Sequence, residues 1–210
     1  MIRWPVTGVL FLGLFVALGL AVAKQPLGID LTVTGAFQGL WRGTFGNLTK
    51  IVSDLLGLVL PAAAVAGLLV GAILAWYRGL RREALIVVRV LVVYGAARLT
   101  SWLGKPIFVR ERPRAYAEFS YPSGHVVAIA STALAATLLC RWLAPALTRR
   151  VAVGSGLLTV LVALTRLVLG VHWLSDTVGA VLGVLGVGLL AAAVVRLLPG
   201  PVPERRSLPL

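Results

Sequence analysis

Apolar residues occur along the chain in long runs that are separated by short polar connections. Each of six runs is close to the roughly 20 residues that an α-helix needs to cross the hydrocarbon core of a bilayer. They cover residues 4–23, 57–77, 84–103, 122–143, 151–169 and 177–198. The pattern predicts an all-α protein, a polytopic bundle of six transmembrane helices, with a single integral membrane domain over residues 1–198.

The two ends of the chain carry weaker signals. The first run also resembles a secretory signal peptide, because Ala21-Val22-Ala23 is similar to a cleavage site. Only one arginine, Arg3, precedes this run, and the run is long enough to span, so we predict a retained helix. Residues 199–210 contain several prolines, and we predict a short disordered cytoplasmic tail there.

Residues 24–56 form a long connection between the first two runs. Apolar side chains recur in it every three to four residues, at Phe37, Trp41, Phe45, Leu48, Val52 and Leu55. This spacing is typical of an amphipathic helix. We therefore expect an additional amphipathic helix on the outer surface, which either packs against the bundle or guides a lipid toward a site.

Composition supports an integral membrane protein. Hydrophobic residues make up 59% of the chain, charged residues 13%, and the mean hydropathy is +0.97, whereas a soluble domain is nearer half apolar and a quarter charged. The single cysteine, Cys140, excludes an intrachain disulfide. The net charge of +13 is spread between the apolar runs, which fits topology signals and an anion site and argues against a nucleic-acid partner.

Positive charges are divided unequally between the two ends of the predicted helices. One side carries eleven cations and two acidic residues, and the other carries nine cations and five acidic residues. The richer side is the cytoplasmic one. We predict a multi-pass protein of the plasma membrane with both termini in the cytoplasm, so that the connections 104–121 and 166–176 face the extracytoplasmic side.

Those two connections, with the helix ends beside them, contain three short motifs. They are Lys105-x6-Arg112-Pro113, Pro122-Ser123-Gly124-His125 and Arg166-x5-His172-x3-Asp176. The chain has no histidine outside these motifs. Ionisable residues at a membrane boundary are costly to place, so a concentration of them indicates a functional site.

Fixed positive charges and a helix start predict a phosphate site. The planar fork of arginine suits phosphate oxygens and lysine adds a compact charge. The candidate phosphate ligands are therefore Lys105, Arg110, Arg112, Arg114 and Arg166. The free N–H groups at a helix N-terminus also bind anions. At that position Ser123 offers a hydroxyl group and Gly124 permits a close approach of the backbone.

The two histidines have different candidate roles. His172 and Asp176 are four residues apart and share one face of a helix. A carboxylate beside an imidazole fixes its tautomer and stabilises the cation that forms when the other nitrogen attacks, which leaves His125 as the general acid. Two histidines and a carboxylate could instead bind a metal, but a third strong ligand is missing and the nearby cations repel a dication. We expect no metal and no cofactor.

In this order the motifs resemble those of the type 2 phosphatidic acid phosphatases (PAP2), membrane lipid phosphatases that share their site with vanadium haloperoxidases. The resemblance covers roughly residues 50–198. It departs at Thr165, where the family usually has serine, although threonine keeps the hydroxyl group. The resemblance implies that His172 attacks phosphorus to give a phosphohistidine, that Asp176 orients His172, and that His125 protonates the leaving oxygen.

The resemblance also implies a metal-independent phosphatase that acts on a lipid phosphate or diphosphate at the outer leaflet. A polyprenyl diphosphate such as undecaprenyl diphosphate is the first expectation, followed by phosphatidylglycerophosphate and phosphatidic acid. Arg98, Arg110 and Arg114 are candidates for contact with a second phosphate. The alternatives are a membrane protein that binds phospholipid without hydrolysing it, a transporter and a haloperoxidase.

Overall fold

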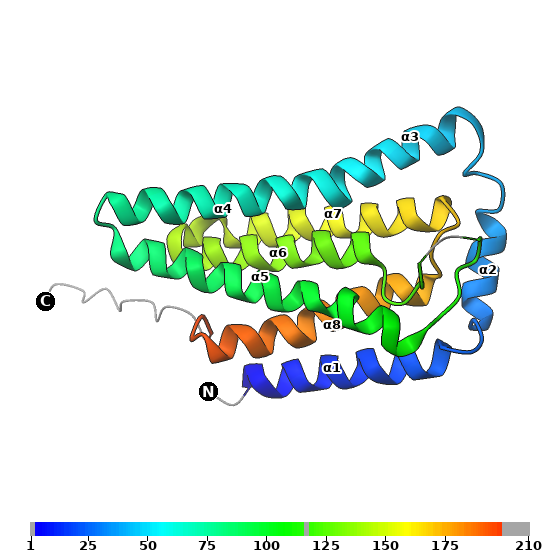
Figure 1. Ribbon diagram of the computed structural model, residues 1–210, viewed down its shortest axis with the longest axis horizontal. Helices are drawn as coiled ribbons and strands as arrows, with labels where there is room; N and C mark the ends of the chain where they lie inside the picture. The colour runs from blue at the N-terminus through cyan, green and yellow to red at the C-terminus, as the bar shows by residue number, and fades with distance from the viewer. Residues whose placement is uncertain (1–2, 116–117, 199–210) are drawn as a thin grey trace, which may run out of the picture.

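The computed structural model describes residues 3–115 and 118–198, which form a bundle of helices without any strand (Figure 1). The elements are α1 (Arg3–Val22), α2 (Gly28–Ala36), α3 (Gly43–Asp54), a π-helical turn (Leu55–Val59), α4 (Leu60–Tyr77), α5 (Arg81–Phe108), α6 (Gly124–Leu143), a 3₁₀ turn (Pro145–Leu147), α7 (Thr148–Val168) and α8 (Leu174–Val194). Six stretches of the described residues are long and apolar enough to cross a membrane. The predicted all-α bundle of six spans is confirmed, and the predicted tail 199–210 lies outside the described residues.

The long helices run side by side, and α2 lies across one end of the bundle (Figure 1). α8 packs against α1, α5 and α6. Its close approach to α1 depends on Gly186, where a Cβ atom would lie 2.7 Å from the backbone nitrogen of Leu12. Small residues of this kind let helices pack closely in a bilayer, where apolar side chains gain little by leaving the lipid.

The segment 24–56 differs from the single amphipathic helix that its pattern predicts. The additional helix is α2, and the chain then turns through Gly39 and Gly43, whose φ angles of 86° and 69° lie in the left-handed region. From Gly43 the chain continues to Tyr77 as one helical stretch of 35 residues, through the π-helical turn and into α4. The predicted boundary between a surface helix and the second span is therefore wrong.

The apolar stripe of this segment faces away from the protein. Phe45, Leu48 and Leu55 expose 56%, 56% and 51% of their surface, whereas Ser53 and Gly57 are buried. Lipid tails solvate apolar side chains, so a membrane helix turns its small and polar residues toward its neighbours. The periodicity marks the lipid-facing side of α3, and the packing side is the polar one.

An aromatic cluster fixes the connection between α5 and α6. Tyr121 is fully buried, its ring stacks on Phe15 of α1 with centroids 5.4 Å apart, and it meets Phe108 edge-on at 5.0 Å. Its hydroxyl group donates a hydrogen bond to the carbonyl oxygen of Phe15 at 2.7 Å. Gly179 of α8 leaves room for the ring, because a Cβ atom there would lie 2.3 Å from Cε2 of Tyr121. The start of α6 is thereby held against α1 and α8.

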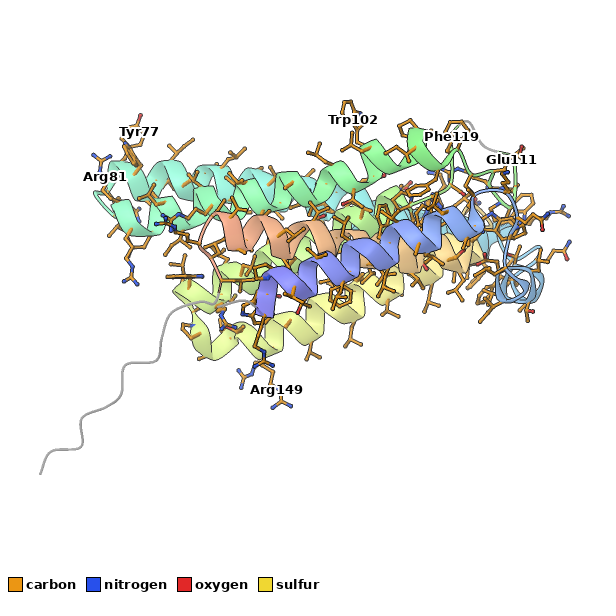
Figure 2. All side chains as sticks on the ribbon, turned by 90° about the horizontal axis from the view of Figure 1, so that it is seen from below. Tyr77, Arg81, Trp102, Glu111, Phe119 and Arg149 are labelled. Carbon is orange, nitrogen blue, oxygen red and sulfur yellow. The ribbon has the colours of Figure 1, made fainter. Side chains whose placement is uncertain are left out.

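The two ends of the bundle differ in character. The turns between α4 and α5 and between α6 and α7 carry arginines such as Arg81 and Arg149, and Figure 2 shows both far from the end with Glu111 and Phe119. The latter end contains α2, the α5–α6 connection and the start of α8 (Figure 1). All three sequence motifs lie there.

Candidate active site

The structure brings together the predicted site residues from four helices and the connections between them. They are Lys105, Arg112, Ser123, Gly124, His125, Arg166, His172 and Asp176. The backbone nitrogen of Ser123 donates to the carbonyl oxygen of Asp176 at 3.2 Å, and Nη1 of Arg112 lies 3.2 Å from Nε2 of His172. The charge of Arg166 acts on both histidines. The motifs therefore form one site.

His172 is held between a carboxylate and a guanidinium. Its Nδ1 lies 3.2 Å from Oδ2 of Asp176, and Arg112 approaches Nε2. Because Arg112 can only donate and the carboxylate can only accept, the proton of the neutral imidazole belongs on Nδ1 and the lone pair on Nε2. Asp176 also accepts a hydrogen bond from the backbone nitrogen of Trp173 at 2.8 Å. The imidazole is thus oriented, although His172 lies two residues before α8 and not within it.

Burial sets the protonation state of His172. The side chain exposes 2% of its surface, and this burial lowers the pKa of the imidazole to about 4; it outweighs the opposing effect of Asp176, and the charges of Arg166 and Arg112 add smaller contributions in the same direction. At neutral pH the imidazole is therefore uncharged. An uncharged imidazole keeps the lone pair of Nε2, and this is the form that can act as a nucleophile.

Asp176 belongs to a buried network that the sequence did not predict. Arg110 donates from Nη1 to Oδ1 of Asp176 at 2.5 Å and from Nη2 to Oδ2 of Asp30 at 2.8 Å. Asp30 comes from α2 and accepts further hydrogen bonds from the backbone nitrogen and the hydroxyl group of Ser175 at 2.9 and 2.6 Å. A buried cation between two buried carboxylates fixes α2 to the start of α8.

Hydrogen bonds keep Asp30 ionised in this network. Burial raises the pKa of its carboxyl, but donation from Ser175, Arg110 and Leu27 outweighs burial and lowers the pKa below its ordinary value. Arg110 itself exposes 2% of its surface. The expectation that Arg110 contacts a second phosphate is therefore wrong, because its guanidinium is enclosed by the two carboxylates.

Arg112 and Lys105 hold the α5–α6 connection as well as the site. Arg112 donates to the carbonyl oxygens of Val171, Glu118 and Phe119 at 2.9, 2.5 and 3.3 Å. Lys105, in the last turn of α5, forms an ion pair with Glu118. The hydrogen bond and charge of Lys105 lower the pKa of the Glu118 carboxyl. An exposed carboxylate of the protein thus lies where the site attracts anions.

The start of α6 offers free donors. Ser123 is its N-cap and is fully buried, and its hydroxyl group has no hydrogen-bond partner among the described residues. A buried hydroxyl without a partner is costly and points to a missing ligand. At Gly124 a Cβ atom would lie 3.9 Å from Nζ of Lys105 and 3.4 Å from Oγ of Ser101. The first turn of α6 therefore approaches the lysine as an anion cradle requires.

Arg166 and Thr165 close the site from α7. Arg166 exposes 5% of its surface and donates from Nη1 to Oγ of Ser53 at 3.2 Å. The hydroxyl of Thr165 donates to the carbonyl oxygen of Val162 at 2.7 Å, within the same helix. The departure from the usual serine therefore leaves a hydroxyl group that is engaged in α7.

His125 has a carboxylate neighbour from an unexpected element. Its Nε2 lies 3.3 Å from Oδ1 of Asp54, the last residue of α3. Asp54 also pairs through Oδ2 with Nζ of Lys50 at 2.6 Å. The apolar pattern of residues 24–56 predicts a surface helix, so the pattern does not identify Asp54 and Ser53 as residues of the site. A lone carboxylate in an apolar stretch was the signal that could have identified Asp54, and Asp30 likewise.

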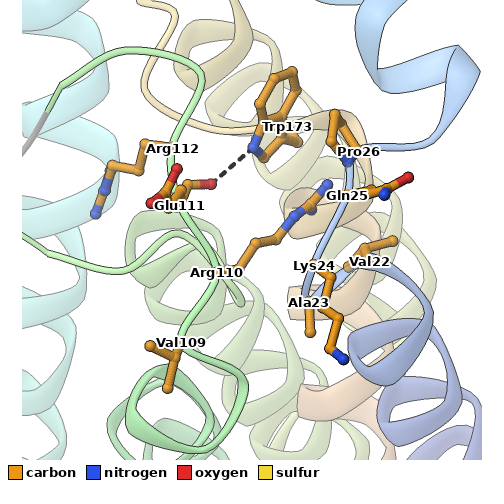
Figure 3. A pocket seen from close by; sticks show the side chains of 10 residues that line it. All are labelled: Val22, Ala23, Lys24, Gln25, Pro26, Val109, Arg110, Glu111, Arg112 and Trp173. Atoms are coloured by element: carbon orange, nitrogen blue, oxygen red, sulfur yellow. Dashed lines mark hydrogen bonds between the residues drawn. The ribbon is translucent and has the colours of Figure 1, made fainter.

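Two cavities lie beside the site. One of about 330 Å³ contains Arg110 and Trp173, whose ring nitrogen donates to the carbonyl oxygen of Glu111 at 2.9 Å (Figure 3). The other, of about 400 Å³, is lined by Trp41, Arg42 and Arg114.

In the larger cavity two guanidinium groups share one aromatic ring. Arg114 lies 4.2 Å and Arg42 4.8 Å from the ring centroid of Trp41. The third candidate for a second phosphate, Arg98, donates to the carbonyl oxygen of Gly124 at 3.3 Å. Arg114 therefore lies at a cavity that a second guanidinium, that of Arg42, also lines.

The donors of the site do not form a metal-binding group. Within residues 3–115 and 118–198, no three side chains of histidine, cysteine, aspartate or glutamate are arranged to hold an ion. The carboxylates nearest the histidines are paired with arginine or lysine. The arrangement suits a bound anion, because Lys105, Arg112 and Arg166 bring positive charge to the site and Ser123 brings a hydroxyl donor.

Comparison with known proteins agrees with this geometry. The family model described as the PAP2 superfamily matches residues 86–198, more than half of the chain, with all three motifs in the match. The chain is also similar to the crystal structure of a transmembrane PAP2-type phosphatidylglycerolphosphate phosphatase from Bacillus subtilis. That similarity has a TM-score of 0.66 at 26% sequence identity and covers 90% of this chain and 94% of the other. No curated protein matches the chain. The motifs, the fold and the family match agree, and the chain belongs to the PAP2 superfamily.

Proposed function

We propose that this protein is a membrane lipid phosphatase that hydrolyses a lipid phosphate or diphosphate through a phosphohistidine intermediate. The observation that carries the proposal is the state of His172: buried, neutral, tied at Nδ1 to Asp176, and with the lone pair of Nε2 facing the cationic connection. The PAP2 match and the lipid phosphatase with a similar structure support the same reaction class.

The first step transfers the phosphoryl group to the protein. Nε2 of His172 attacks phosphorus, the bond from phosphorus to the leaving oxygen breaks, and His125 donates a proton to that oxygen. Asp176 stabilises the positive charge that develops on the imidazole. The equatorial oxygens are held by charge and by hydrogen bonds. These ligands are Lys105, Arg112, Ser123, the Gly124 amide and Arg166.

The second step releases phosphate. His125, now neutral, takes a proton from water as the water oxygen attacks phosphorus, and the bond between phosphorus and Nε2 of His172 breaks. The electron pair returns to the imidazole, and His125 is again protonated for the next turnover. This sequence uses only side chains of the site, so we expect it to be independent of metal ions and cofactors.

The charge distribution supports an extracytoplasmic site. The arginine-rich turns lie at the end of the bundle opposite the site (Figure 2), and arginine-rich connections stay in the cytoplasm. Both termini are then cytoplasmic, and the site opens at the outer leaflet. A fluorescent protein fused to the C-terminus tests this arrangement, because it matures in the cytoplasm; a fusion that is dark yet present in the membrane would contradict it.

For the substrate we propose a polyprenyl diphosphate first, then phosphatidylglycerophosphate and phosphatidic acid. The cavity with Trp41, Arg42 and Arg114 favours a headgroup with a second anionic group. Arg114→Ala is expected to lower kcat/KM about tenfold more for a diphosphate than for phosphatidic acid. If the ratio of kcat/KM between the two substrates is unchanged in Arg114→Ala, this cavity does not bind the second phosphate.

The proposal is tested by phosphate release from the purified protein in detergent with a chelator present. The panel consists of undecaprenyl diphosphate, phosphatidylglycerophosphate and phosphatidic acid, and the reference is His172→Ala, which is expected to lose at least about 10³-fold in kcat. Release that survives the chelator and disappears in the variant supports the histidine mechanism. A protein that binds these lipids but releases no phosphate would instead be the non-catalytic phospholipid-binding protein.

A further inference from the structure

A second carboxylate–imidazole pair lies at the site, and its carboxylate comes from outside the part of the chain that the family model matches. Asp54 Oδ1 and His125 Nε2 are 3.3 Å apart, and Asp54 precedes residues 86–198. Of their side-chain surface, His125 exposes 19% and Asp54 exposes 34%. None of the three motifs contains Asp54, so its contact with His125 calls for a physical account.

The backbone of the long helix brings Asp54 to His125. The π-helical turn Leu55–Val59 follows Asp54 directly, and a single π turn within an α-helix is frequent at functional sites. Within it Gly57 lies against the imidazole: a Cβ atom there would be 2.5 Å from Cδ2 and 2.9 Å from Cβ and Cγ of His125. Only glycine permits this approach, so the helix is fitted to the ring.

The same face of the helix reaches a second site residue. Ser53, which is fully buried, accepts a hydrogen bond from Arg166 at 3.2 Å. The end of α3 thus contacts residues of two different motifs, His125 on α6 and Arg166 on α7. A surface ion pair with Lys50 alone explains neither contact, because Lys50 lies one turn earlier and is exposed.

A general acid must carry a proton before it can donate one, and the surroundings of His125 make this demanding. The ring is largely buried, and the cations Arg166 on α7 and Lys105 on α5 act on it; burial first, and then these charges, disfavour the imidazolium. Asp54 on α3 is the carboxylate that hydrogen-bonds the ring. A carboxylate at Nε2 also leaves Nδ1 as the nitrogen that can serve the leaving oxygen.

We infer that Asp54 is the positioning residue of the general acid: it holds the His125 imidazole through Nε2 and favours its protonated form, with the transferable proton on Nδ1. The inference rests on the proposed role of His125. The two carboxylate–imidazole pairs then use opposite ring nitrogens. Asp176 binds Nδ1 of His172, so that Nε2 reacts, whereas Asp54 binds Nε2 of His125, so that Nδ1 transfers the proton.

The first test compares leaving groups. Asp54→Asn keeps the size of the side chain but loses its charge. For phosphatidic acid, whose alkoxide needs a proton, kcat/KM is expected to fall about 10²-fold; for p-nitrophenyl phosphate, whose leaving group needs none, it is expected to fall less than about threefold. Asp54→Glu is expected to recover part of the loss. Equal losses on both substrates would indicate a merely structural role and overturn the inference.

The second test moves the imidazole and leaves the carboxylate in place. Gly57→Ala is expected to reproduce the leaving-group dependence of Asp54→Asn, because the new methyl group displaces the His125 ring. Gly67→Ala is the matched control in the same helix, where a Cβ atom would meet nothing within 4 Å, and it is expected to behave as wild type. A Gly57→Ala variant with wild-type rates on both substrates contradicts the fitted geometry.

The third test needs no turnover. The chain has two histidines, so ¹⁵N-labelled imidazoles give two titrations by NMR, and His172→Gln assigns the remaining one to His125. In that background Asp54→Asn is expected to move the midpoint of His125 to lower pH by about one unit or more. An unchanged midpoint overturns the inference. Wild-type protein without phosphatase activity would refute the proposed function, and the titration would still decide whether Asp54 supports the imidazolium.

Discussion

The two carboxylate–imidazole pairs of the site differ in their surroundings. His172 and Asp176 expose 2% and 0% of their side-chain surface, and the carboxylate of Asp176 accepts a hydrogen bond from the buried Arg110. His125 and Asp54 expose 19% and 34%, and the partner of Asp54 is the exposed Lys50. The buried pair suits a nucleophile that must stay neutral and fixed, and the open pair suits an acid that exchanges protons with water at every turnover.

Removing the charge of the buried pair is expected to have the largest effect. In Asp176→Asn the amide no longer fixes the proton on Nδ1 of His172, and the developing imidazolium loses its counterion. We expect kcat to fall about 10⁴-fold on every substrate, including p-nitrophenyl phosphate. The loss in Asp54→Asn is expected to depend on the leaving group, whereas the loss in Asp176→Asn is not. If the loss in Asp176→Asn also depended on the leaving group, the two pairs would not have separate roles.

The network behind the buried pair is expected to affect stability. Asp30→Asn leaves Arg110 with one carboxylate in a buried position, and we expect the free energy of unfolding to fall by about 3 kcal/mol. For Asp54→Asn at the open pair we expect a change below about 1 kcal/mol. Reversible unfolding in mixed micelles measures both. Similar losses in the two variants would mean that the difference in burial has no energetic consequence.

The pH dependence of the buried pair follows from the burial of His172. The pKa of His172 is lowered to about 4 by burial, below the ordinary value near 6.5. Between these values the unfolded chain binds a proton that the folded chain does not, so this group contributes a loss of stability as pH falls from about 6.5 to 4. In the NMR titration His172 is expected to remain neutral at pH 5.5. A midpoint near 6.5 would show that burial does not control its charge.

The smallest effect is expected from the exposed carboxylate that pairs with Lys105. Glu118 forms an ion pair with Lys105 and exposes 62% of its side chain. A lipid phosphate must displace this carboxylate, so Glu118→Gln is expected to lower KM about threefold with kcat unchanged. Steady-state kinetics with phosphatidic acid measures the change. A raised KM would mean that Glu118 shapes the site for the substrate instead of competing with it.

The fold and the motif residues could be predicted because both leave local signals. Long apolar runs give the spans, and the spacing from Arg166 to Asp176 gives one face of the site. The inner face of α3 could not be predicted in this way. In a soluble protein the apolar stripe points inward, but here Phe45 and Leu48 point outward and Ser53 points inward. The periodicity of apolar residues shows which side of a helix is apolar, but not whether that side faces lipid or the rest of the protein.

Long-range pairing was the other limit. Arg110 was assigned to an incoming phosphate because its carboxylate partners lie far away in the sequence, Asp30 on α2 and Asp176 on α8. The ion pair with Asp30 depends on α2, which crosses the end of the bundle (Figure 1). Charge in a motif connection indicates a site, but the three-dimensional fold decides which cations remain for the ligand.

The length of the helical stretch from Gly43 to Tyr77 also indicates the depth of Asp54 in the membrane. Asp54 stands 23 residues before its last residue, which at 1.5 Å per residue is about 35 Å along the axis. The hydrocarbon core is about 30 Å thick. When the turn after Tyr77 rests at one membrane surface, Asp54 stands at the level of the headgroups of the opposite leaflet. At that level the carboxylate–imidazole pair of Asp54 and His125 would lie at the height of the phosphate of a membrane lipid.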